Sequence, residues 1–228
     1  MTAGAAPPYP GAVTRRGPLG DWWVRNFVKR RFVLARDTPG APDRAKVTLV
    51  GYDVVGYGAG AGRELPAPQR RSLAQAIGEE RLARRLADQD LTAFVAVAPD
   101  GATAGFVWSL APRAETAWHD NVPVRPGTAL LFHGYVAPEH RRHGLFTWLM
   151  TAVQDHCLLR LGRERVLGVV EASNVPSLRT LGNLGYEHVA DNYLVKVLGV
   201  NVVSVLRWRE RRGTEAHFVF MRPRGRSR

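Results

Sequence analysis

Cysteine is almost absent from this sequence. Cys157 is the only cysteine among 228 residues, which excludes a disulfide framework and any metal site built on several thiolates. The chain contains no run of about 18 apolar residues, the length that a membrane-spanning helix needs. Its start, Met1 to Pro10, lacks the basic-then-apolar order of a signal peptide. We therefore expect a cytoplasmic protein without a metal site.

Lysine is also scarce, so arginine carries the positive charge. Only three of the 32 basic residues are lysines, and 20 acidic residues leave a net charge of +12. Arginine binds phosphate through a planar fork of donors, which makes polyanions plausible partners. Much of the excess positive charge lies at residues 15–36 and 207–228. Charge at the ends of a chain indicates solubility and electrostatic steering of anions before it indicates nucleic-acid binding. Nucleic acid is an unlikely partner, because the sequence carries no aromatic RNA-binding motif, zinc finger or clear helix-turn-helix.

The composition predicts one folded domain. Hydrophobic residues at 45% and charged residues at 23% match globular averages. Residues 1–20 are rich in Ala, Pro and Gly and should form a flexible segment. Residues 21–228 should form a single domain, a monomer or homodimer, that begins with a helix and ends in a basic tail.

Aromatic and basic residues mix in residues 21–36, which we expect to form a helix with Asp21 as its N-cap. Two interpretations stay open. The helix packs on its own domain with its charged face in water, or it makes transient contact with an anionic membrane surface.

The remaining pattern alternates strands and helices. We expect strands at 47–55, 92–98, 104–110, 129–136 and 165–171, paired strand segments at 187–190 and 193–200, helices within 69–88, at 144–161 and at 175–184, a flexible connection at 56–62 and a polar loop at 111–127. An apolar stripe supports the helix at 144–161, and Cys157 belongs to that stripe as a small buried hydrophobe.

The segment between the strand at 129–136 and the following helix is strongly basic. Pro138 ends the strand and Gly144 precedes the helix, so a tight loop meets the positive end of the helix dipole. His140, Arg141, Arg142 and His143 add cationic donors there. The loop is either a phosphate site or simply an exposed basic loop.

Two motifs around this loop resemble those of a known family. The pattern Arg, two residues, Gly, one residue, then a small residue falls on Arg141, Gly144 and Phe146, with phenylalanine at the last position. An Asn that opens a short helix ending in Gly and an aromatic falls on Asn174, Gly185 and Tyr186. In this order and spacing, the chain resembles the GNAT superfamily of acyl-CoA-dependent N-acyltransferases.

The resemblance implies an α/β (α+β) fold. Its central sheet would be mixed and mostly antiparallel, flanked by helices, with the parallel fourth and fifth strands splayed apart. It also implies transfer of an acyl group from acetyl-CoA, or another short acyl-CoA, to a primary amine by direct attack. The implied contacts to this coenzyme A thioester are the main-chain amide of Val136, the amides of Arg141, Arg142, His143, Gly144, Leu145 and Phe146 on the pyrophosphate, and Asn174 with Ser177 on the pantetheine arm.

The catalytic groups are less clear. Many relatives place a tyrosine acid where this chain has Leu181. Glu171, His133 and Tyr135 are the candidates, and alternation along a strand puts His133 and Tyr135 on one face. Two alternatives remain: a non-catalytic coenzyme A-binding regulatory or scaffold protein, and a basic nucleic-acid or membrane-surface binder. The identity of the acyl acceptor is open, because nothing in the sequence specifies it.

Overall fold

The architecture is built on one large sheet with helices on both faces. The computed structural model describes residues 28–40, 49–197, 200–208 and 216–220. Its strands are β1 (Val28–Arg36), β2 (Asp53–Tyr57), β3 (Leu91–Val97), β4 (Thr103–Leu110), β5 (Ala117–His119), β6 (Val122–Val124), β7 (Thr128–Val136), β8 (Arg165–Glu171), β9 (Glu187–Val197), β10 (Val200–Trp208) and β11 (Ala216–Phe220). Its helices are α2 (Ala67–Ile77), α3 (Glu79–Ala87), α4 (Leu145–Asp155) and α5 (Val175–Asn183). None of the helices in these ranges is long and apolar enough to cross a membrane.

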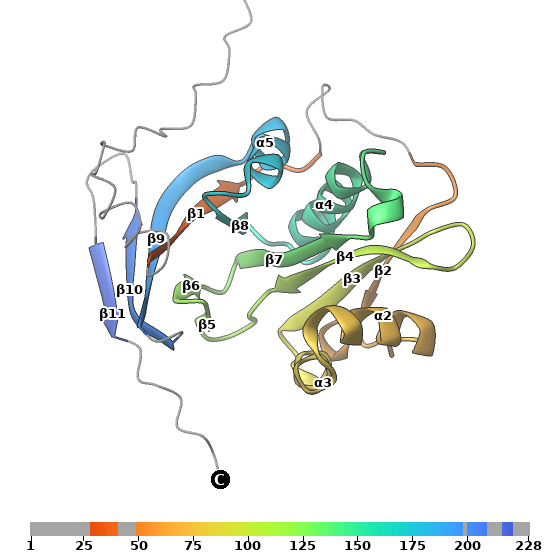
Figure 1. Cartoon of the computed structure of the whole chain (residues 1–228), viewed down its shortest axis with the longest axis horizontal. Helices are drawn as coiled ribbons and strands as arrows, with labels where there is room; N and C mark the ends of the chain where they lie inside the picture. Colours follow the sequence, from red (N-terminus) through yellow and green to blue (C-terminus); the bar gives the residue numbers. More distant parts are fainter. Residues whose placement is uncertain (1–27, 41–48, 198–199, 209–215, 221–228) are drawn as a thin grey trace, which may run out of the picture.

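The strands of the main sheet follow the order β11-β10-β9-β1-β8-β7-β4-β3-β2 (Figure 1). Among the described strands, only β7 and β8 run parallel, and the other neighbours are antiparallel. The mixed, mostly antiparallel sheet flanked by helices that the sequence predicts is therefore confirmed. Strands β5 and β6 form a separate small hairpin.

Each face of the sheet has its own apolar core. Leu149 of α4 and Leu181 of α5 belong to the cluster on one face. Leu73 of α2, Leu82 of α3 and Val122 of β6 belong to the cluster on the other face. The sheet is thus a middle layer, with α4 and α5 covering one side and α2, α3 and the β5–β6 hairpin covering the other.

The expected helix at residues 21–36 is wrong over its described part. Residues 28–36 form β1, a strand between β8 and β9 near the middle of the sheet, whereas residues 21–27 lie outside the described residues. Phe32 and Leu34 face one core, and Val33 and Ala35 face the other. Four consecutive buried apolar residues suit a strand covered on both faces, so tertiary burial overrides the pattern of aromatic and basic residues.

Other boundaries also differ from expectation. Of the first strand expected at 47–55, residues 47–48 lie outside the described residues, and within the described part the strand begins at Asp53. The connection at 56–62 starts with the end of that strand and continues into a 3-10 turn at Ala59–Ala61. The polar loop at 111–127 contains the β5–β6 hairpin. The segments expected to pair at 187–190 and 193–200 are mostly one continuous strand, β9, which pairs with β1 and β10 instead.

The expected helix at 144–161 is shorter in the structure. Helix α4 ends at Asp155, and one π-helical turn follows at His156–Arg160. Cys157 is fully buried there, as expected, whereas Leu161 is 43% exposed beyond the helix. Residues within the basic tail expected at the end of the chain form β11, the outermost strand of the sheet.

The two parallel strands separate toward their carboxyl ends. Main-chain pairing joins Thr128–Leu131 of β7 to Arg165–Gly168 of β8 and extends no further. Strand β7 nevertheless continues to Val136 and β8 to Glu171. The facing main-chain groups of these last residues therefore have no partner strand within the described chain.

A β-bulge interrupts β7 at residues 133–134. Phe106 of β4 pairs with Tyr135, but Trp108 pairs with Phe132, so one residue of β4 lies opposite two residues of β7. His133 adopts a left-handed backbone with φ 55°. Such a bulge shifts the alternation of side chains by one position.

The bulge decides which face His133 and Tyr135 occupy. Plain alternation would place both with Leu131, on the face that α4 and α5 cover. Instead, His133 contacts Arg85 of α3, and the Tyr135 ring packs on Phe106 in the opposite core. The two side chains do share a face, but it is the face covered by α2 and α3.

Candidate active site

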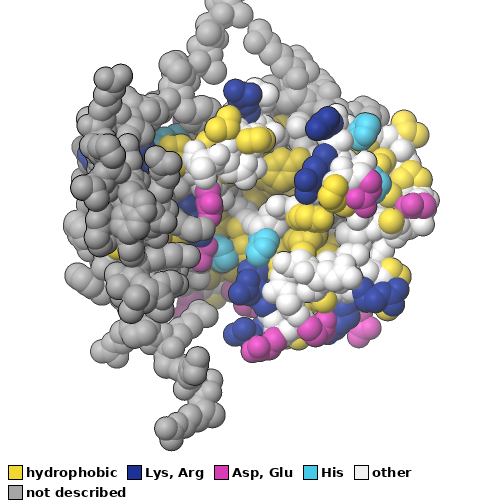
Figure 2. Space-filling view, in the orientation of Figure 1, with side chains coloured by type: hydrophobic (Ala, Val, Ile, Leu, Met, Phe, Trp, Pro, Cys, Tyr) yellow, Lys and Arg dark blue, Asp and Glu magenta, His cyan; other side chains and the backbone are white. Residues whose placement is uncertain are grey.

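A cavity of about 750 Å³ lies in the gap between β7 and β8. On the side of α4 and α5 it is lined by Phe146, Met150, Asn174, Ser177 and Leu181. On the side of α3 and the β5–β6 hairpin it is lined by Arg81, Arg84, Arg85, Trp118, His119 and Asp120. The cavity therefore passes through the sheet. Figure 2 shows a hollow in the viewed side of the molecule, bordered by histidine, basic and acidic side chains.

The loop before α4 presents main-chain donors and exposed cations. Arg141 Nε donates to the main-chain oxygen of Val136 at 3.0 Å, and Gly144 takes a left-handed backbone with φ 78°. The Trp148 amide donates to the Gly144 oxygen and closes the first turn of the helix. The amides of residues 145–147 precede that bond and have no acceptor inside the helix. Free amides at the positive end of a helix suit an anionic group.

The cations of this loop differ in their surroundings. Arg141, Arg142 and His143 are exposed. His140 is half-buried, and its Nδ1 lies 3.0 Å from the Tyr52 hydroxyl. His140 therefore anchors the loop, which leaves the three exposed side chains to meet a ligand.

The end of β7 turns main-chain groups toward the gap. The Ala137 amide donates to the Ala104 oxygen of β4 at 2.9 Å. Because successive peptide groups of a strand point to opposite sides, the Val136 amide faces away from β4. An extended amide-containing chain inserted between β7 and β8 would meet this donor, much as an added strand would.

The start of α5 lies at the same cavity. Asn174 Oδ1 accepts a hydrogen bond from the Ser177 amide at 3.2 Å, so Asn174 caps the helix. Leu181, about two helical turns after Asn174, is buried against Gly168 of β8. Leu181 carries no titratable group, so this position supplies no proton to the cavity.

Phe146 is the large residue at the end of the loop motif, and its ring fits there because residue 134 is a glycine. A Cβ atom on Gly134 would lie 2.8 Å from Phe146 Cε2, so the phenyl ring rests on bare backbone of the β7 bulge. Phe146 also lines the cavity. The ring therefore narrows the cavity where a small residue would leave space.

The β5–β6 hairpin forms one wall on the opposite side of the sheet. Asp120 and Asn121 both have positive φ, 48° and 66°, the conformation that a two-residue hairpin turn requires. The Asp120 carboxylate is paired with Arg31 of β1, and its main-chain oxygen accepts from Asn192 Nδ2 at 3.0 Å. These two contacts fix the hairpin against the sheet.

His119 stands next to this turn as a neutral imidazole. Its ring centroid lies 3.8 Å from that of Phe132, and its side chain is 21% exposed. Burial lowers the pKa of His119 to about 4, against the opposing charge of Asp120, and Arg85 adds to the lowering.

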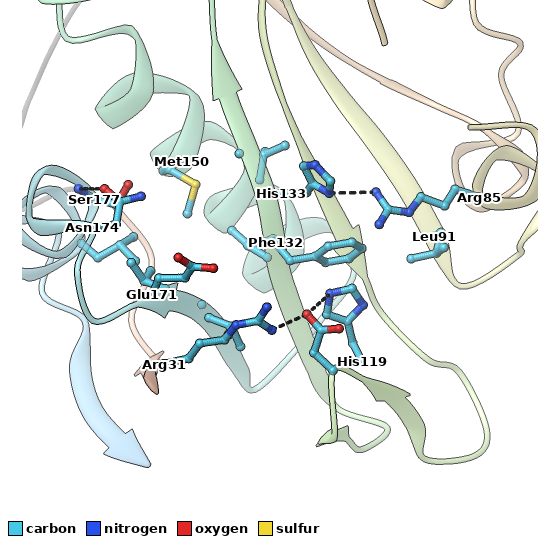
Figure 3. A pocket seen from close by; sticks show the side chains of 18 of the residues that line it. Arg31, Arg85, Leu91, His119, Phe132, His133, Met150, Glu171, Asn174 and Ser177 are labelled. Carbon is cyan, nitrogen blue, oxygen red and sulfur yellow. Dashed lines mark hydrogen bonds and ion pairs between the residues drawn. The ribbon is translucent and has the colours of Figure 1, made fainter. Parts of the chain in front are cut away.

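His133 and Arg85 meet across the cavity (Figure 3). The Arg85 Nη1 and His133 Nδ1 atoms are 3.3 Å apart. Burial, together with Arg85 and Arg81, lowers the pKa of His133. A guanidinium can only donate, so His133 Nδ1 must accept and the proton of the neutral ring resides on Nε2.

Glu171 reaches into the cavity from the end of β8 (Figure 3). It pairs in register with Arg31 of β1, and alternation along β8 places it with Leu167 and Val169 on the α3 side. Glu171 and His133 thus line one cavity from the two separated strands.

Three other residues considered from the sequence, Tyr135, Tyr186 and Cys157, do not line the cavity. Tyr135 is 38% exposed and lies outside the lining of the cavity. Tyr186 is buried, and burial raises its pKa; burial also raises the pKa of the Cys157 thiol to about 11. Neither group is poised to react at neutral pH. Among the described residues, no cluster of three or more His, Cys, Asp or Glu side chains could hold a metal ion.

Sequence reasoning missed His119, Arg85 and Arg31 as parts of the site. The turn residues Asp120 and Asn121, between the short apolar runs 117–119 and 122–124, are a hairpin signal that could have revealed the first of them. Arg85 and Arg31 gave no such signal, because each resembles many other arginines in the chain.

Comparisons with known proteins agree with this geometry. Residues 61–186 match the sequence model described as the acetyltransferase (GNAT) family. A solved tandem GNAT protein from the clavulanic acid biosynthesis pathway is 18% identical with a TM-score of 0.52, over 79% of this chain and 58% of that one. A GCN5-related N-acetyltransferase from Sphaerobacter thermophilus is 20% identical with a TM-score of 0.51, over 74% of this chain and 50% of that one.

At these identities the two structures support the fold, and this chain spans only 58% and 50% of their lengths. No curated protein matches the chain.

Proposed function

The chain belongs to the acetyltransferase (GNAT) family, and on that premise we propose that it transfers an acyl group from acetyl-CoA, or another short acyl-CoA, to a primary amine. The observation that carries the proposal is the cavity through the sheet at the gap between β7 and β8. It connects the face where α4 begins to a face lined by titratable side chains.

The residues present fit a coenzyme A thioester. Amides at the start of α4, with Arg141, Arg142 and His143 around them, would hold the phosphates. The edges of β7 and β8 where the two strands no longer pair with each other, including the Val136 amide, would receive the pantetheine arm, with Asn174 and Ser177 at its side. The thioester supplies an activated acyl carbon and a thiolate leaving group.

The acceptor nitrogen must lose a proton before or during its attack. For an amine with a pKa of about 10.4, deprotonation at pH 7 costs about 4.6 kcal/mol. We assign the proton to the Glu171 carboxylate, directly or through a water, because Glu171 lies in the cavity at the open end of β8. His133 is unsuited to this role while its Nδ1 accepts from Arg85.

His133 has a complementary role in the proposal. Its Nε2–H would donate a hydrogen bond to the sulfur as the carbon–sulfur bond breaks, which stabilises the thiolate without proton transfer. A thiolate with a pKa of about 8.5 is a reasonable leaving group with such help. The nitrogen–carbon bond forms, the carbon–sulfur bond breaks, and the thiolate later takes a proton from water.

Melting experiments test the cofactor half of the proposal. Coenzyme A at about a hundred times its dissociation constant should add about 2.7 kcal/mol to folding, a rise in melting temperature of about 5 to 10 °C. The double variant R141Q/R142Q should lose most of this rise, and the control R71Q, on exposed α2 surface, should keep it. An unchanged rise in the double variant would contradict the loop assignment.

Turnover experiments test the chemical half. Thiol release from acetyl-CoA is measured with a panel of amines, and products are identified by mass spectrometry. The variants H133A and E171Q should each lower kcat by about 10- to 1,000-fold with little change in coenzyme A affinity. If coenzyme A binds but no amine is acylated, the chain is a binding protein and the enzymatic proposal fails.

A further inference from the structure

The acceptor side of the cavity is rich in arginine. Arg31, Arg81, Arg84 and Arg85 all line it. Arg31 is paired with Asp120 and Arg84 with Glu80. Within the part of the chain that the structure describes, Arg81 and Arg85 have no carboxylate at ion-pair distance.

Arg85 is held in place by aromatic rings. Its guanidinium carbon lies 5.0 Å from the centroid of Phe132 and 5.3 Å from that of Trp108. These contacts, with the one to His133 Nδ1, fix the head group at the cavity wall (Figure 3). A guanidinium has five N–H donors, so most of its hydrogen-bonding capacity is left for other partners.

The electrostatic state of Arg85 is unfavourable without a counter-ion. Burial, together with the like charge of Arg81 four residues earlier on α3, lowers the pKa of Arg85 to about 10, although the charge of Asp120 acts in the opposite direction. Two like charges at this helical spacing repel each other. An anion held by both guanidinium groups would relieve the repulsion and the loss of solvation.

We propose that the acyl acceptor is an amine that also carries an anionic group, a carboxylate or a phosphate, which Arg85 binds together with Arg81. This inference rests on the proposed acyl transfer and names its substrate class. With the anion on α3, the acceptor's amine can extend toward the gap between β7 and β8, where Glu171 lies. Polycationic acceptors would meet repulsion at the same place.

Matched pairs of amines test the proposal. β-Alanine is compared with β-alaninamide, and phosphoethanolamine with ethanolamine, all with acetyl-CoA as donor and with rates expressed per unprotonated amine. The anionic member of at least one pair should show a kcat/KM higher by about 10-fold or more. Which pair responds distinguishes carboxylate from phosphate. Equal rates within both pairs, or faster rates for the neutral members, would overturn the proposal.

Variants assign the effect to Arg85. R85Q removes the charge, R85M also keeps the apolar packing on Trp108 and Phe132, and R71Q removes an equal charge outside the cavity. The preference for the anionic amine should fall about 10- to 100-fold in R85Q and R85M and stay unchanged in R71Q. The ratio within a pair cancels any loss that acts through His133. An unchanged ratio in an R85 variant that still melts cooperatively would contradict the assignment.

Three further results separate the possible failures. If the R85 variants instead lose the use of succinyl-CoA relative to acetyl-CoA, Arg85 binds an anionic acyl group and the proposal about the acceptor is wrong. If the wild-type chain acylates neutral amines only, the acyltransferase proposal stands and this inference fails. If the chain acylates no amine at all, the proposed function itself fails.

Discussion

Phe146 and Gly134 depend on each other at the level of single residues. The variant G134A would place a Cβ atom 2.8 Å from the Phe146 ring, which forces the ring or the backbone to shift. Because the ring lines the cavity and can move into it, we expect the free energy of unfolding to fall by about 1 kcal/mol. Urea titration of the purified variant measures this loss.

A double-mutant cycle supplies the control for this pair. F146A alone should also destabilise, because it leaves a cavity, but G134A should cost little when it is added to F146A. Strict additivity of the two losses would show that the Gly134 backbone and the Phe146 ring do not interact as described.

His119 should make stability depend on pH. Its pKa is about 4 in the folded chain and about 6.5 when unfolded. Between these values the unfolded chain binds more protons, so stability falls as the pH drops from about 6.5 toward 4. From pH 8 to pH 5 this histidine should cost about 2 kcal/mol.

The variant H119Q isolates this contribution, because His133 shifts in the same direction and remains in both chains. Urea denaturation of wild type and H119Q at both pH values gives the difference. If the two chains lose equal stability on acidification, His119 is not protected from protonation by burial.

At single residues, the sequence indicated positions better than roles. Glu171 and His133 were expected on the two strands that separate, and both line the cavity, while their catalytic roles stay predictions. Tyr135 does not line it, and Arg85 was missed. Its importance comes from aromatic neighbours on β4 and β7, which are distant in sequence and carry no joint signal.

Helix α5 depends on its cap at the scale of secondary structure. The variant N174A removes the acceptor for the Ser177 amide and should lower the free energy of unfolding by about 1 kcal/mol. N174S, which can still cap, should restore most of it. Thermal or urea unfolding of the three chains makes the comparison.

Coenzyme A titration of the same chains separates capping from binding. If Asn174 also contacts the cofactor, N174S will keep stability yet lose affinity. Equal affinity in wild type and N174S would limit Asn174 to its structural role.

The bulge in β7 shows why elements were predicted better than faces. The strand at 129–136 was expected almost as it is, because its apolar pattern is local. The extra residue at 133–134 arises from pairing with β4, so a period-two pattern predicts that His133 and Tyr135 share a face but not which side of the sheet that face is on. The helices expected within 69–88 and the strand expected at 165–171 were predicted well for the same local reason.

The charge of the whole molecule should affect binding of an anionic cofactor. A net charge of +12 attracts phosphate groups over long distances, and dissolved salt screens this attraction. Raising the ionic strength from about 50 to about 500 mM should weaken coenzyme A binding by about 10-fold. Calorimetry at several salt concentrations measures the change.

Pantetheine, which lacks the phosphates, is the matched control. Its affinity should respond little to the same change in salt. A similar response by both ligands would show that salt acts on the fold rather than on attraction between charges.

At this scale the class of fold was predictable and the order of strands was not. Motifs around residues 141–146 and 174–186 pointed to the family, and the sheet is mixed as expected. The place of β1 depends on partners more than 120 residues away in sequence, as the pairing of Arg36 with Val166 illustrates. No local pattern encodes such a contact.

The central position of β1 has a consequence for biosynthesis. Strands β9, β10 and β11 connect to the rest of the sheet through β1, which is synthesised before the other described strands, while both of its neighbours, β8 and β9, are synthesised late among them. During translation β1 has neither of its partner strands, β8 and β9, until residues 165–197 leave the ribosome. We expect late, cooperative closure of the sheet after synthesis and a need for protection from aggregation in the interval.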